Sequence, residues 1–157
     1  MGKGHYPTNP DYSQVRKRGS IINGFGGVAS GPQPLIDLID NLTELLMPKD
    51  GEPYKISSAI IVDIFNMVGK CVVSGGIRRT AEIMFGDPYD HEFVTLKQDK
   101  EKLHSHRWAS NNSVFGTIGM DYSGVADSIA KNGEPGVIWL DNMQHYRRMN
   151  GERGRYD

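Results

Sequence analysis

The sequence predicts an α/β fold with a parallel sheet. Segments whose apolar residues recur at helical spacing alternate along the chain with segments in which apolar and polar residues take turns, the pattern typical of strands. Glycine-rich stretches separate them, at 24–32, 75–76 and 133–136. Only about three strands can be counted, fewer than a parallel sheet covered on both faces usually has. The chain is therefore predicted to form part of a larger sheet.

The first helix is predicted to follow a polar lead-in and a glycine loop. Residues 1–20 show neither period, and GFGGVASGP at 24–32 is a loop because its glycines favour irregular backbone. Pro34 suits the first helical turn, since the N–H that it lacks would be unpaired there. An apolar stripe then follows one side of the helix, formed by Leu35, Leu38, Ile39, Leu42, Leu45 and Leu46.

The second helix is predicted to begin after a cap at Ser57 or Ser58 and to end before Gly75 and Gly76. Its apolar residues cover more than one side, so we expect it to be buried against several neighbours. Cys71 falls inside this helix and is predicted to belong to the core, as a small apolar side chain.

The second half of the chain is predicted to hold the strands. Alternation predicts them at 80–85, 108–120 and 137–140. The stretch 86–93 is expected to be a turn that leads into a short helix, and a further helix over 125–131 ends at Asn132-Gly133.

Three parts are expected along the chain. Residues 1–20 form an extended lead-in, 21–143 an α/β segment, and 144–157 a polar tail without a core of its own. The polar stretch 98–107 is predicted to be exposed or loop-like.

Composition and charge argue against several classes of protein. With 157 residues, 38% of them hydrophobic, the chain suits one domain with a real core. The net charge of −1 includes no basic excess, so no nucleic-acid partner is expected. No apolar run of about 18 residues exists and no signal peptide is recognised, so no membrane is expected and the location is predicted to be cytoplasmic. A single cysteine excludes an internal disulfide framework.

The glycine loop is one candidate site. Backbone N–H groups at Gly27, Ser30 and Gly31, next to the start of a helix, would suit a phosphate. The pattern is neither of the established phosphate-binding motifs, and a tight structural loop is the favoured alternative.

The adjacent arginines Arg78 and Arg79 are a second candidate. At the start of a strand, successive side chains point to opposite faces, so one arginine is expected to point inward. An inward guanidinium needs a carboxylate, such as Glu82, or a phosphate as its partner. Of the two partners, the residues alone favour the structural salt bridge.

His104 and His106 form an HxH pair, but no third or fourth metal ligand stands near them in the sequence. No metal site is therefore predicted.

Four blocks together resemble one protein family. They are GFGGVASGP (24–32), GKCVVSGGIRRTAEI (69–83), FVTLKQDKEKLHSHRWASNNSV (93–114) and NGEPGVIWLDN (132–142). In this order and spacing they resemble the central part of the adenosylcobalamin-dependent (class II) ribonucleoside-triphosphate reductases. The resemblance implies a segment of the ten-stranded α/β barrel of ribonucleotide reductases, in which a cysteine thiyl radical starts reduction of the ribose and two further cysteines supply electrons.

The resemblance also implies what is missing. The Asn-Pro-Cys-Gly-Glu type run that carries the radical cysteine is expected shortly after residue 150, and the upstream cysteine before Met1. Cys71 does not match a catalytic thiol, so no catalytic residue is transferred to this chain. The expectation is a fragment or split subunit that is inactive alone. It needs complementary reductase segments, and the assembled enzyme would use adenosylcobalamin, a thioredoxin-like reductant and a ribonucleoside triphosphate.

Within that barrel the expected substrate contacts are Arg78, Arg79, Asn111, Asn112 and Ser113. The alternative to an enzyme fragment is a non-catalytic nucleotide-binding or scaffold protein derived from the barrel. A third possibility is a remnant without a present role.

Overall fold

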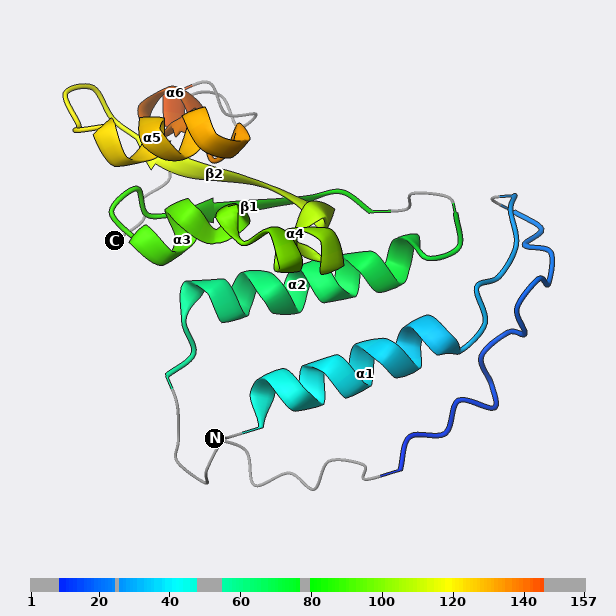
Figure 1. Cartoon of the computed structure of the whole chain (residues 1–157). Helices are drawn as coiled ribbons and strands as arrows, with labels where there is room; N and C mark the ends of the chain where they lie inside the picture. Colours follow the sequence, from blue (N-terminus) through cyan, green and yellow to red (C-terminus); the bar gives the residue numbers. More distant parts are fainter. Residues whose placement is uncertain (1–8, 25, 48–54, 77–79, 146–157) are drawn as a thin grey trace.

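The structure, a computed structural model, describes residues 9–24, 26–47, 55–76 and 80–145. Along the described residues, helices precede, separate and follow the three strands, which confirms the α/β class predicted from the sequence (Figure 1). The helices of more than one turn are α1 (Gln33–Leu46), α2 (Ser58–Val73), α3 (His91–Thr95), α4 (Lys100–Ser105), α5 (Ser123–Asn132) and α6 (Leu140–His145). The strands are β1 (Glu82–Gly86), β2 (Ser110–Gly116) and β3 (Gly136–Trp139), and the 3-10 helices are η2 (Leu96–Gln98) and η3 (Arg107–Ala109).

The three strands form one parallel sheet in the order β1-β2-β3, with β2 in the middle. Glu82 of β1 pairs with Ser110 of β2, and Val114 of β2 pairs with Val137 of β3. Successive side chains of a strand point to opposite faces, and paired residues of neighbouring strands point to the same face. The register therefore fixes which side chains share a face. The parallel arrangement predicted from the order of elements is thereby confirmed.

One face of the sheet is covered by helices and carries the core. Val114 of β2 is fully buried there, among apolar residues of α2, α3, η2 and α5. The remaining members of this cluster are Ala59, Val62, Phe93, Val94, Leu96 and Val125. Gly86 at the end of β1 lies under the ring of Phe93, where a Cβ atom would overlap the ring. The helical layer is therefore packed tightly against the strands.

Helix α1 packs on α2 and lies farther from the sheet than α2 does (Figure 1). Its apolar stripe is only half-buried, and no residue of α1 is fully buried. The order of layers is thus sheet, α2, α1.

The helix ends follow the predicted signals. The Ser57 side chain accepts a hydrogen bond from the backbone N–H of Ile60, which caps α2. Gly133 ends α5 with a φ of 81°, a left-handed conformation that favours glycine. Gly76 has a φ of 80° just beyond α2.

The prediction that the stretch 98–107 is exposed or loop-like is wrong at its end, where two basic side chains are buried. The stretch forms α4 and the start of η3, and it ends in two buried basic residues, His106 and Arg107. The error has a physical cause. Basic side chains predict an exposed segment only where no buried carboxylate can pair with them, and here Asp63 pairs with both.

The described residues include no helix long and apolar enough to cross a membrane. Gln144 and His145 belong to α6, and the rest of the predicted tail lies outside the described residues. The expected part boundaries after residues 20 and 143 stay predictions.

Candidate functional site

Strand β2 sends its side chains alternately to the two faces of the sheet. Ser110, Asn112 and Val114 are buried on the helix-covered face, whereas Asn111 is exposed on the other face and Ser113 is half-buried there. The structure therefore separates Asn112 from the two other β2 residues expected to contact a substrate.

The uncovered face combines polar groups with an apolar floor. Asn111 pairs with Ile83 and Ser113 with Phe85 of β1, and parallel partners share a face. The Phe85 side chain is 42% exposed, and its ring centroid lies 5.6 Å from that of Phe115. On this face the described strand residues offer an amide and a hydroxyl but no thiol, carboxylate or imidazole. The surface can bind and orient a ligand by hydrogen bonds, but it contains no group for proton transfer.

Asn112 is held in place by the ion pair of Lys97, which is buried, and Glu134, which is 26% exposed. Its backbone N–H donates to Oε2 of Glu134 over 3.0 Å, and its side-chain oxygen accepts from the Ser110 hydroxyl over 2.9 Å. Nζ of Lys97 lies 2.8 Å from Oε2 of Glu134 and also donates to the Ser110 carbonyl. These bonds fix the backbone of β2 directly beneath Asn111 and Ser113.

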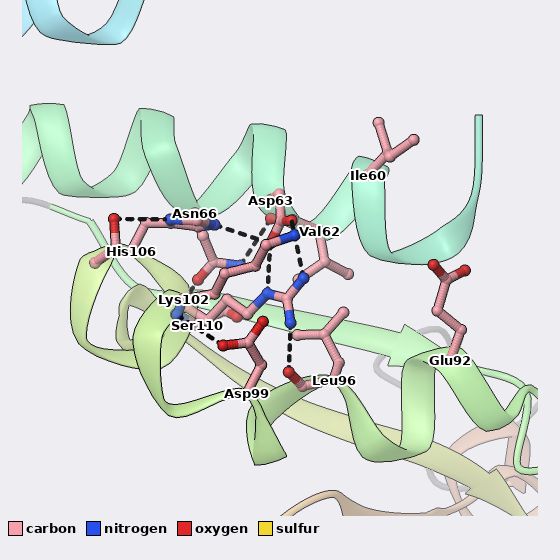
Figure 2. A network of polar contacts seen from close by, with 12 residues as sticks. Ile60, Val62, Asp63, Asn66, Glu92, Leu96, Asp99, Lys102, His106 and Ser110 are labelled. Carbon is pink, nitrogen blue, oxygen red and sulfur yellow. Dashed lines mark hydrogen bonds and ion pairs between the residues drawn. The ribbon is translucent and has the colours of Figure 1, made fainter. Parts of the chain in front are cut away.

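A second network joins α2 to the start of β2 (Figure 2). Asp63, only 1% exposed, accepts hydrogen bonds from Nε and Nη2 of Arg107 over 2.6 and 2.9 Å and from Nε2 of His106 over 2.9 Å. Nζ of Lys102 is farther away, 3.4 Å from Oδ2 of Asp63. Bidentate arginine–carboxylate contacts are among the strongest and most directional in proteins.

The partners of Asp63 decide its protonation. Burial on its own would raise the pKa of Asp63, but the hydrogen bonds from His106 and Arg107 and the arginine charge lower the pKa far below its usual range. The carboxylate is therefore charged at neutral pH.

Asn66, one turn after Asp63, completes this connection. Its Oδ1 accepts the backbone N–H of Ser110 over 2.8 Å, and its Nδ2 donates to the Val62 carbonyl. The first backbone donor of β2 is thus bound to α2 rather than to another strand. The network supports the sheet; it does not form part of the uncovered face.

Reasoning from the sequence missed this network, although the sequence contained a signal. Asp63 and Asn66 are polar residues one turn apart on a helix that is otherwise apolar on several sides. Such a pair requires buried partners, and the basic residues at 106 and 107 were available to provide them.

The arginine candidates cannot be placed, because Arg78 and Arg79 lie outside the described residues. Glu82, their suggested carboxylate partner, lies on the helix-covered side against Gly69 of α2, where a Cβ atom would overlap its carboxylate.

The glycine loop forms a small hairpin. Ile21 bridges Val28, and the backbone N–H of Ala29 donates to the Ser20 carbonyl over 2.8 Å. Ser30 and Gly31 line a hollow of about 210 Å³ that also includes Gly75 just beyond α2. An anion there would face the negative end of the α2 dipole, which does not favour a phosphate. The phosphate-loop assignment of Gly27, Ser30 and Gly31 stays a prediction.

The two histidines and the cysteine considered in the sequence do not contribute to the uncovered face. The His104 ring bonds the Lys100 carbonyl while His106 bonds Asp63, so the two histidines do not converge. Cys71, predicted to be core, is half-buried and lines a hollow of about 240 Å³ between α1 and α2. Burial raises the pKa of this thiol, and the charge of Asp37 raises it further.

Known proteins match this chain over most of its length. A family model described as the insertion domain of B12-dependent ribonucleotide reductase matches residues 9–46. A Dictyostelium discoideum protein, described as a "probable adenosylcobalamin-dependent ribonucleoside-triphosphate reductase", is 54% identical over 88% of this chain and 18% of its own length. The adenosylcobalamin-dependent ribonucleoside-triphosphate reductase of Euglena gracilis is 46% identical over 90% of this chain and 20% of its own length.

The fold matches as well. A crystal structure of a B12-dependent (class II) ribonucleotide reductase superposes with a TM-score of 0.74 at 43% identity, over 85% of this chain and 18% of that one. The chain thus spans about a fifth of the length of the relatives it matches.

Proposed function

Because the chain belongs to the family of adenosylcobalamin-dependent ribonucleotide reductases, we propose that it supplies one segment of the catalytic α/β barrel of such an enzyme. The proposed reaction of the assembled enzyme is reduction of a ribonucleoside triphosphate to the deoxyribonucleoside triphosphate. The segment is inactive alone and acts with complementary segments that carry the remaining strands.

The observation that carries this proposal is the match in sequence and fold to about a fifth of a reductase. The uncovered sheet face supports it. Parallel sheets are normally covered on both faces, and here the apolar residues Ile83 and Phe85 have no cover from the described helices. A larger protein provides that cover.

The proposed substrate contacts are Asn111 and Ser113 on the uncovered face, together with Arg78 and Arg79, which precede β1 in the sequence. Asn112, placed on the covered face, acts on the site through the backbone of β2. An amide and a hydroxyl suit sugar hydroxyl groups, and guanidinium groups suit phosphates.

The cofactor is proposed for the assembled enzyme alone. Adenosylcobalamin, when bound, supplies the radical that begins the reaction. The described residues do not fit it by themselves: even the hollow of about 330 Å³ beside Asp63 is at the lower limit for a drug-sized ligand. Cys71 lies between α1 and α2, on the helical side of the sheet, so the thiols for the chemistry must come from other segments.

Reconstitution tests the proposal. The two parts of the Dictyostelium discoideum relative that flank the matched region are co-expressed with this chain. The purified complex then receives adenosylcobalamin, a dithiol and a ribonucleoside triphosphate. We expect deoxyribonucleotide only when all three polypeptides are present.

Two controls make the result decisive. Omitting this chain must abolish the product, and Asn111→Ala must lower turnover at least ten-fold in a complex that still assembles. A stable complex that binds the nucleotide without forming product would instead favour the scaffold alternative.

A further inference from the structure

Helix α2 presents a large apolar stripe on one side. Ile61, Phe65, Val68 and Val72 form it, and all four side chains are exposed, Phe65 to 53%. Contiguous exposed apolar side chains of this size mark an interaction site in a soluble protein.

The spacing of the stripe identifies what fits it. The residues follow one another by four, three and four positions, which is the spacing of a seam along which one helix packs lengthwise on another. At 3.6 residues per turn, the stripe lies about a third of a turn around the helix from Asn66, which marks the side that meets the sheet. It also lies about a third of a turn from the side that meets α1. Helix α2 therefore has three packing sides, and two of them are occupied.

The charges of the two helices support this interpretation. Aside from Cys71, the ionisable side chains of α2 are Asp63, which is directed to Arg107, and Lys70. A helix that is apolar nearly all round is one that is buried in its complete protein. Helix α1, in contrast, exposes Asp40 and Glu44 on the side opposite its apolar stripe. Helix α1 thus closes the layer on its own side, whereas α2 remains open.

The sheet is open on the same side. Within the described part of the chain, β1 pairs with β2 alone, so its other edge is free. Around α2, Asp63 faces Arg107, which leads into β2, and Gly69 lies against Glu82 of β1. The stripe follows Gly69 around the helix, on the side away from Asp63, and is therefore next to the free edge of β1. In parallel sheets a strand added at an edge brings a helix onto the adjoining face.

We infer that a helix from the part of the reductase outside this chain packs lengthwise along Ile61, Phe65, Val68 and Val72. This inference rests on the proposed function and names the first contact of assembly. The occupying helix has apolar residues at alternating spacings of three and four. It comes from the remaining four-fifths of the enzyme, because a second copy of this chain on the stripe would leave the free edge of β1 without a strand.

Site-specific crosslinking tests the inference in the three-polypeptide complex described above. A photoreactive benzoylphenylalanine replaces Phe65, and crosslinked peptides are identified by mass spectrometry. We expect crosslinks to one peptide of a flanking part whose apolar residues recur at helical spacing. The same group at Ile118, 93% exposed in the turn after β2, serves as the control and should not crosslink to that peptide.

Three results would overturn the inference: crosslinks to a second copy of this chain, crosslinks to a segment without helical apolar spacing, or none in an assembled complex. Association is measured in parallel with Phe65→Asp, which should weaken assembly at least ten-fold, and with Ile118→Asp, which should leave it unchanged. The isolated Phe65→Asp variant should keep the unfolding midpoint of the parent chain, because Phe65 is exposed there.

The two proposals fail in different ways. If the complex forms product and Phe65→Asp assembles normally, the stripe is not the docking surface, while the proposed function stands. If the parts assemble through the stripe but form no product, the inference stands and the proposed function fails. Polypeptides that do not associate at all would overturn both.

Discussion

The two faces of β2 differ in how completely this chain supplies their partners. On the covered face, Ser110 and Val114 are buried, and the backbone N–H groups of Ser110 and Asn112 donate to Asn66 of α2 and to Glu134. On the other face, Asn111 is exposed to solvent, and the ring of Phe115 packs against the ring of Phe85. A parallel strand that is covered on one side and open on the other is what we expect of a segment of a larger protein, as proposed above. We therefore expect changes on the covered face to affect stability, and changes on the open face to affect assembly and function.

The largest effect should follow from removing the buried carboxylate of the covered face. Asp63→Ala leaves Arg107 buried without its partner, which we expect to lower the free energy of unfolding by about 3–5 kcal/mol. Urea denaturation followed by circular dichroism measures the change. The matched control is Lys102→Ala, since Lys102 is 47% exposed and should contribute no more than about 1 kcal/mol. Equal effects of the two changes would contradict the buried network.

Lowering the pH should gradually reduce the stability that Asp63 provides on the covered face. The folded state lowers the pKa of Asp63, so its contribution is fully present above the pKa of the unfolded chain, about 3.9, and is lost as the pH falls below it. We expect the free energy of unfolding to decrease between about pH 5 and pH 2. Asp63→Asn should make that decrease shallower in urea titrations over this pH range. An unchanged slope in the variant would show that other carboxylates govern acid unfolding.

Overpacking tests how closely the helices sit on the covered face. Gly86→Ala places a methyl group against the Phe93 ring and should cost about 1–3 kcal/mol in thermal or urea unfolding. Gly124→Ala is the matched control, because Gly124 lies in α5 with open space around it and alanine favours helices. The control should be neutral or stabilise the chain by up to about 1 kcal/mol. A neutral Gly86→Ala would mean that Phe93 moves aside freely.

The smallest effect on stability is expected on the open face. Phe85→Ser should change the free energy of unfolding of the isolated chain by less than about 1 kcal/mol, because the ring is already partly in solvent. In the reconstituted complex the same change should weaken assembly measurably, as followed by co-purification. A large loss of stability in the isolated chain would indicate that the open face is covered within this chain.

Sequence patterns located most of the elements. Period and caps predicted α1, α2 and α5, with Ser57 and Gly133 at the expected ends, because these signals act within a few residues of the backbone they satisfy. Alternation predicted β1 and β2, and the order of elements predicted a parallel sheet. The four sequence blocks, in their order and spacing, were sufficient to identify the family.

The candidate site was predicted less completely. Asn111 and Ser113 lie on the open face as alternation allows, but the sequence could not say which face of β2 the helices would cover. That choice placed Asn112 in the core. Arg78 and Arg79 remain predictions.

By itself, therefore, the sequence determined the α/β class, the element boundaries near their caps, and the membership of a reductase family. Only the tertiary structure decided that His106 and Arg107 are buried on Asp63, that Asn66 holds the first donor of β2, and that one side of α2 is left open. The physical reason is distance along the chain: caps and periods act over a few residues, whereas Asp63 and Arg107 are 44 residues apart and meet only after the helices have packed.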